Sequence, residues 1–127
     1  MDKLVIPVAP SVNHAYRNFD NGNRRMRVPT KKTEQFKQEA GWIAKAWRAH
    51  TSWVIPPEDQ KIIVRMWVYW QNRSRRDADN LFKVTLDALT GILYLDDRMC
   101  LPRVMDFSVD RTNPRVELEL EVMEVTG

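Results

Sequence analysis

Two aspartates, a lysine and several arginines crowd one short stretch of this sequence, "SRRDADNLFK" at residues 74–83. Asp77 and Asp79 are two residues apart, so in an extended chain their carboxylates point to the same side. Two carboxylates this close repel each other unless a proton or a divalent cation lies between them. Ligands that are all oxygen favour Mg²⁺, with Mn²⁺ as an alternative, over zinc. The stretch therefore indicates a divalent metal site.

A second pair of acids follows in "YLDDR", where Asp96 and Asp97 are adjacent. One predicted helix, from Asn80 to about Gly91, separates this pair from Asp79. A chain that turns back after such a helix can return beside the start of the helix. We therefore expect either Asp96 or Asp97 to complete the metal site.

The cations around these acids suit a phosphate. Lys83 comes four residues after Asp79 and so lies one turn along the same helix face. A lysine there can hold a phosphate oxygen or stabilise the charge that develops on phosphorus. The flanking arginines can grip neighbouring phosphates; they are Arg73, Arg75 and Arg76. A bound metal and phosphate would explain why cations and acids are gathered together.

Each of these residues also has a simpler interpretation. Asp77 or Asp79 can cap the helix, because aspartate is favoured at that position. Lys83 can pair with Asp79 or Asp87 on the helix surface, and the acids of "YLDD" can belong to a turn. We assign Asp87 to structure, because it lies a further turn along the helix. No single alternative explains the two acids together with Lys83.

The composition fits one domain that covers residues 1–127, with a hydrophobic content of 43% and a charged content of 29%. The net charge is only +3, but its distribution is uneven. The acidic end "ELELEVMEV" contrasts with a basic region before it that holds Arg17, Arg24, Arg25, Arg27, Lys31 and Lys32. This asymmetry favours a surface that binds a polyanion, and ordinary solvated charge is an equally good interpretation.

The remaining reactive side chains are few. Cys100 is the single cysteine, which excludes an internal disulfide and a cysteine-based zinc site and favours a buried, inert thiol. His14 and His50 are isolated in the sequence, and we assign both to structure or surface. The first residues are too short in their apolar run for a signal peptide, and no stretch is long enough to span a membrane. We expect a cytoplasmic protein.

The hydrophobic pattern predicts an α+β fold with two main helices on one small mixed sheet. Strands are expected at residues 3–8 and 61–70, and an antiparallel pair at 103–110 and 115–122, joined across "RTNP". One helix begins near Thr30, and the second covers about residues 80–91. The turn residues "DNGN" predict the tip of a hairpin or loop.

The strand at residues 61–70 has two different faces. One face is apolar throughout, and the other carries Arg65, Trp67 and Tyr69 among its residues. Such a mixed face suits cover by a second subunit, so we take these three residues as a candidate subunit contact.

Taken together, these motifs resemble the RusA family of Holliday junction resolvases. The resemblance rests on "PSVNHAYRN", "RRDADNLFKVTLDALTG", "YLDD" and the C-terminal strand with alternating acids, and it covers nearly the whole chain. It implies a small α/β homodimer, common in phage and prophage genomes, that cleaves four-way DNA junctions with Mg²⁺ or Mn²⁺. It also implies that Asp77, Asp79 and Asp97 bind the metal and that Lys83 is catalytic.

The function expected from this resemblance is resolution of junctions by paired symmetric nicks, in DNA recombination and repair. Two alternatives remain open: a nuclease for other branched structures such as flaps, and a junction- or replication-associated DNA-binding protein that does not cleave. On any of these interpretations the basic residues named above are candidates for the phosphate track.

Overall fold

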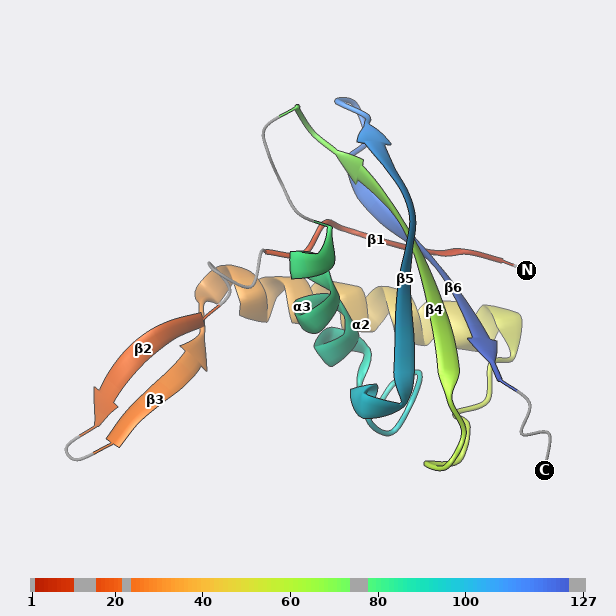
Figure 1. The fold of residues 1–127 in the computed structure, drawn as a ribbon, viewed down its shortest axis with the longest axis horizontal. Helices are drawn as coiled ribbons and strands as arrows, with labels where there is room; N and C mark the ends of the chain where they lie inside the picture. Colours follow the sequence, from red (N-terminus) through yellow and green to blue (C-terminus); the bar gives the residue numbers. More distant parts are fainter. Residues whose placement is uncertain (1, 11–15, 22–23, 74–77, 124–127) are drawn as a thin grey trace.

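A mixed four-stranded sheet, two helices and a separate two-stranded hairpin make up the computed structural model (Figure 1). The structure describes residues 2–10, 16–21, 24–73 and 78–123, with only the backbone for 16–21, 24–28, 79 and 80. In chain order the elements are β1 (Leu4–Ile6), β2 (Tyr16–Asn21), β3 (Arg24–Pro29), α2 (Lys31–Thr51), β4 (Ile62–Trp70), α3 (Asp79–Leu89), the 3₁₀ turn η1 (Asp97–Met99), β5 (Cys100–Val109) and β6 (Arg115–Val122).

The order of strands in the main sheet is β1-β6-β4-β5. β6 pairs antiparallel with both β1 and β4, whereas β4 and β5 are parallel. Parallel neighbours cannot be joined by a tight turn, so the chain must cross from the end of β4 back to the start of β5. α3 lies in this crossover, which is the segment that carries the candidate site.

The predicted antiparallel pair of residues 103–110 and 115–122 is wrong. Both segments are strands, but β4 lies between them. β6 has β1 on one side and β4 on the other, whereas β5 is an edge strand and most of its residues are exposed. The turn residues around "RTNP" indicate that the chain reverses direction there. They do not indicate that the two strands on either side of the turn are separated by a third strand, β4.

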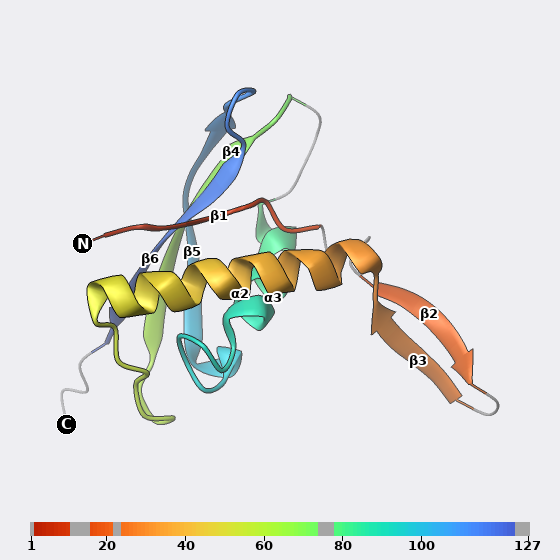
Figure 2. The same ribbon diagram turned by 180° about the vertical axis from the view of Figure 1, so that it is seen from behind.

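α2 begins where the sequence indicated. The side chain of Thr30 accepts a hydrogen bond from the backbone N–H of Thr33, as an N-cap does, at 3.4 Å. Phe36, Ala40 and Ala44 then face the core along one side of the helix. α2 runs across the same side of the sheet as α3, and Figure 2 shows it in front.

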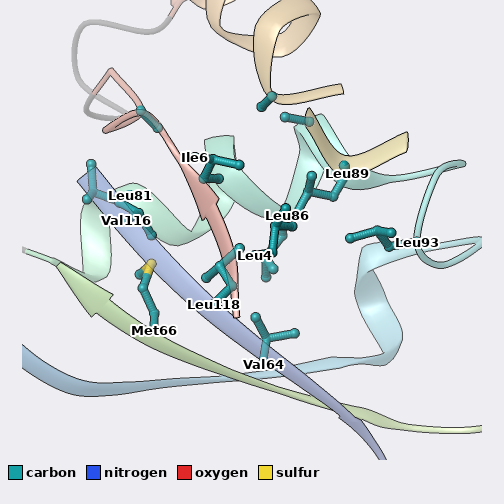
Figure 3. Packing of buried hydrophobic residues seen from close by; sticks show 14 of the residues in the cluster. Leu4, Ile6, Val64, Met66, Leu81, Leu86, Leu89, Leu93, Val116 and Leu118 are labelled. Atoms are coloured by element: carbon teal, nitrogen blue, oxygen red, sulfur yellow. The ribbon is translucent and has the colours of Figure 1, made fainter. Parts of the chain in front are cut away.

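The core lies between this face of the sheet and the two helices (Figure 3). From the sheet, Val64, Met66 and Leu118 are fully buried, and from the helical side so are Leu89 and Leu93. This layered packing uses the apolar faces that the periodicity predicted for β4 and β6.

The outer face of the sheet is covered by side chains of the same chain. Lys3 lies over the ring of Trp67, and Arg115 over the ring of Tyr69, each 3.9 Å from the ring centroid. Arg65 forms an ion pair with Glu121 at 2.7 Å. The aromatic rings thus have cations of the same chain against them, and the subunit contact expected on this face stays a prediction.

β2 and β3 form a hairpin that stands away from the main sheet (Figures 1 and 2). Their antiparallel register pairs Tyr16 with Pro29 and Asn21 with Arg24, so "DNGN" falls at the tip as predicted. Figure 1 shows β3 leading into the start of α2. The β2–β3 hairpin, here called the arm, is thus connected to the rest of the molecule through α2. Among the described residues, no helix is long and apolar enough to cross a membrane.

The core predicts a large effect of truncating β6. Leu118 is fully buried, so Leu118→Ala should lower the free energy of unfolding by about 2–5 kcal/mol, through lost contacts and a residual cavity. Urea denaturation measures this loss. The control is Val54→Ala, where the side chain is 79% exposed; it should change stability by less than about 0.5 kcal/mol. Equal effects of the two substitutions would contradict this account of the core.

Candidate active site

The first group of candidate residues lies at the start of α3. The helix begins at Asp79, and Lys83 is exposed one turn later. The N-cap residue is Ala78, without a side-chain hydrogen bond to the helix, so Asp79 is not the cap of this helix. Asp77, Arg75 and Arg76 lie outside the described residues, as does the side chain of Asp79.

The two acids of "YLDDR" have different surroundings. Asp96 caps η1, because its Oδ1 accepts a hydrogen bond from the backbone N–H of Arg98 at 3.0 Å. Asp97 follows it as the first residue of η1. Since Asp96 already has a structural role, this geometry favours Asp97 as the metal ligand, which remains a prediction.

Asp97 lies in a region of concentrated negative charge. Partial burial raises the pKa of its carboxyl, and a hydrogen bond that protonated Asp97 donates to Asp96, together with the charges of Asp96 and Asp87, raises the pKa further. Repulsion between these carboxylates is relieved when a proton or a cation binds to one of them. The carboxylate is therefore chemically suited to a divalent ion, for which oxygen ligands are preferred.

Asp87 has a cation of its own. Its Oδ2 lies 2.5 Å from Nζ of Lys37 on α2, so the ion pair ties the two helices together. This contact agrees with the structural assignment of Asp87.

Side chains from distant parts of the chain fix the turn that leads to Asp97. Arg48 donates to the backbone oxygen of Ile92 at 2.9 Å, and Trp53 donates through Nε1 to that of Leu93 at 2.8 Å. The hydroxyl of Tyr94 donates to the backbone oxygen of Leu86 at 2.5 Å. The turn is therefore held against both the end of α2 and the body of α3.

A glycine and two buried side chains also belong to the region of this turn. Gly91 has φ of +83°, a conformation that side chains disfavour, and its N–H donates to the backbone oxygen of Tyr94 at 2.7 Å. Burial raises the pKa of the Tyr94 hydroxyl above its ordinary value, and burial also raises the pKa of the Cys100 thiol to about 12. Both groups are neutral near pH 7, and Cys100 is the inert thiol that the sequence indicated.

The two halves of the candidate site lie at different ends of α3. The side chains that influence Asp97 include Asp87, which is eight residues beyond Asp79 and therefore about 12 Å along the helix axis. Figure 1 shows η1 near the C-terminal end of α3. The expectation that the chain returns beside the start of the helix is therefore not met.

The reason is the parallel pairing of β4 and β5. Ile62 at the start of β4 lies opposite Cys100 at the start of β5. Asp79 follows the end of β4, whereas Asp97 precedes the start of β5. Within the described residues, which leave out Asp77 and the side chain of Asp79, no three His, Cys, Asp or Glu side chains are grouped as a metal site.

The candidate phosphate-binding residues fall in two places. Lys31 and Lys32 are exposed at the start of α2, and Arg73 is exposed after β4. The other candidate residues are arginines of the β2–β3 hairpin. Arg17 is in β2, and Arg24, Arg25 and Arg27 are in β3. The arm and the start of α2 are thus adjoining parts of one basic segment.

Comparison with protein families now decides the class of protein. The family model of the endodeoxyribonuclease RusA matches residues 6–121, nearly the whole chain. The chain belongs to the RusA family. Membership supports a nuclease and agrees with the mixed α+β fold. A search of curated proteins found no match.

Sequence reasoning missed the residues that hold the turn of this RusA-family chain. Arg48 and Trp53 lie 44 and 40 residues from the carbonyl groups that they bind. No periodicity or spacing rule links positions so far apart, and the acceptors are backbone atoms that carry no sequence signal. Tyr94 stands two residues before the acid pair, but its role depends on burial that only the fold provides.

The raised pKa of Asp97 predicts how stability depends on pH. The folded state binds this proton more tightly than the unfolded state, so stability rises as pH falls through the folded pKa. In metal-free buffer at neutral pH, Asp97→Asn should therefore stabilise the protein. The gain should stay below about 1 kcal/mol, because the carboxyl is partly exposed and screened by water.

Chemical denaturation with EDTA present checks this effect. The gain should vanish at acid pH, where the carboxyl is neutral in both states. Asp59→Asn is the matched control and should leave stability unchanged, because this exposed acid is not among the carboxylates that crowd Asp97. A loss of stability in Asp97→Asn at neutral pH would contradict the charge crowding described here.

Proposed function

We propose that this chain is a metal-dependent endonuclease that resolves Holliday junctions by paired symmetric nicks, in DNA recombination and repair. The family match over residues 6–121 carries the proposal. The sequence supports it further, because the aspartates and the lysine that the family resemblance implies all occur here. The expected products carry a 5′-phosphate and a 3′-hydroxyl, and the expected compartment is the cytoplasm.

Each candidate residue has a separate role. Asp77, Asp79 and Asp97 would hold Mg²⁺, or alternatively Mn²⁺, which when bound polarises a phosphoryl oxygen and lowers the pKa of an attacking water. Lys83 is exposed one turn into α3, where its charge can stabilise the transition state. The crowding of acids around Asp97 supports a cation at this place.

The separation of Asp79 from Asp97 supports a homodimer. Asp79 begins α3, whereas Asp97 is influenced by Asp87 near the other end of that helix, and this arrangement favours ligands from two chains over ligands from one. A second copy related by a two-fold axis would supply Asp97 to the Asp79 of the first, and the reverse contact would follow by symmetry. Two equivalent sites then match the two-fold symmetry of a four-way junction.

The arm suits the role of a DNA contact. An isolated two-stranded hairpin is marginally stable in water, so one that stands away from the core suggests a partner surface. Its four arginines, with Lys31 at the start of α2, point to the phosphate backbone as this partner. Arg73, Arg75 and Arg76 would hold the phosphates nearer to the site of cleavage.

A cleavage assay on a synthetic four-way junction tests the activity, with linear duplex and flap DNA as controls. The junction should be cut by symmetric nicks in Mg²⁺ and left intact in EDTA. Asp79→Asn should lower the rate at least ~100-fold and Lys83→Met about 10²–10³-fold, since each removes charge stabilisation in the transition state. Faster cleavage of flaps would instead favour a nuclease for other branched structures. Tight binding with no cleavage in Mg²⁺ or Mn²⁺ would favour the DNA-binding protein.

Mixing two inactive variants tests the shared site. Neither Asp79→Asn nor Asp97→Asn should cleave alone, but a mixed dimer holds one site with both aspartates intact. We expect mixing to restore single nicks in the junction, measured on a denaturing gel. The control mixes Asp79→Asn with Lys83→Met. Both of those residues lie on the same chain's helix, so no intact site can form. Absence of recovery in the first mixture would show that each site belongs to one chain.

A further inference from the structure

Two side chains from the C-terminal end of α2 bind the backbone of the turn between α3 and η1. Nη1 of Arg48 donates to the backbone oxygen of Ile92 at 2.9 Å, and Nε1 of Trp53 donates to that of Leu93 at 2.8 Å. The two acceptors belong to successive residues, so two adjacent peptide groups of the turn are fixed from another part of the chain. Arg48 and Trp53 are here called the clamp.

The geometry at the end of α2 orients the clamp. Ser52 ends the helix with φ of +59°, and after this left-handed residue the N–H of Trp53 donates to the backbone oxygen of Arg48 at 3.2 Å. The indole of Trp53 also packs against that of Trp47, with ring centroids 5.8 Å apart. The indole is thus oriented by contacts within α2 and its cap, independently of the turn that it binds.

The clamped turn leads to Asp97. The residue that follows the clamped pair, Tyr94, is 1% exposed, and its hydroxyl donates to a backbone oxygen of α3. On the other side of Asp97, Cys100 begins β5, which is paired with β4. Asp97 therefore lies on a short span, residues 95–99, and both ends of this span are fixed to the core.

Repulsion between acids acts against this placement. Asp97 lies close enough to Asp96 and Asp87 for their negative charges to act on its carboxyl. Like charges push the span away from α3 unless its backbone is held. The clamp binds backbone oxygens, so it can oppose this repulsion without occupying the carboxylate itself.

We propose that Arg48 and Trp53 are positioning residues for the metal site, because they hold the turn that sets where the carboxylate of Asp97 lies. The inference rests on the proposed function, in which Asp97 is a metal ligand. Buried backbone oxygens also need donors for stability alone, and that role would leave the metal affinity of a folded variant unchanged. A positioning role lowers the affinity, because a ligand that moves more freely loses that freedom when the metal binds.

Trp53→Phe tests the clamp, because it removes the indole N–H and keeps an aromatic ring beside Trp47. Titration of the whole chain with Mn²⁺, followed by electron paramagnetic resonance without DNA, measures the dissociation constant. We expect Trp53→Phe to raise this constant about tenfold, as loss of a group that supports a metal ligand does. An unchanged constant in folded Trp53→Phe would overturn the proposal.

Thr51→Val is the matched control. The hydroxyl of Thr51 donates to the backbone oxygen of Trp47 at 2.8 Å, so this hydrogen bond stays within α2. Its loss should leave the dissociation constant of Mn²⁺ unchanged, and a rise equal to that of Trp53→Phe would show a structural effect only. Arg48→Ala should also weaken binding, whereas Arg48→Lys keeps a donor for the turn and should regain part of the affinity.

A double-mutant cycle separates positioning from other effects on the metal. In the Asp97→Asn background, Trp53→Phe should raise the dissociation constant no further, because the ligand that the clamp holds is already lost. An equal further loss in the double variant would contradict the inference alone. An Asp97→Asn variant that binds Mn²⁺ as tightly as the unaltered chain would instead refute the ligand assignment in the proposed function, and the positioning role with it.

Discussion

β4 pairs with β6 on one side and with β5 on the other, and its pairing with β5 is parallel. Parallel pairing forces the chain through a long crossover, which contains α3, η1 and every acidic residue of the candidate site. It also sets the polarity of that crossover, with Asp79 after one end of the sheet and Asp97 before the other. The distribution of the candidate residues therefore follows from one strand pairing.

The sheet has one face buried beneath the helices and another covered by its own charges. On the outer face, Lys3 and Arg115 lie over aromatic rings while also pairing with Glu117. The charges of this face are therefore paired within the chain.

The acidic residues near the candidate site have different roles. Asp87 pairs with Lys37 and Asp96 caps a turn, so these two acids support the fold. Asp97 lies next to both, and partial burial together with their negative charges raises the pKa of its carboxyl. Arg48, Trp53 and Tyr94 hold the turn before it, so the position of this acid is set by the core.

The sequence by itself determined the chemical inventory, both main helices, the hairpin tip and the alternating faces of β4 and β6. These follow from local periodicity, capping and turn residues, for which neighbours along the chain suffice. Only the tertiary structure decided that β4 separates β5 from β6, that Asp97 lies far along α3 from Asp79, and that Arg48 and Trp53 bind the intervening turn. Strand order and contacts across 40 residues or more depend on which surfaces bury each other, and a linear pattern does not encode that choice.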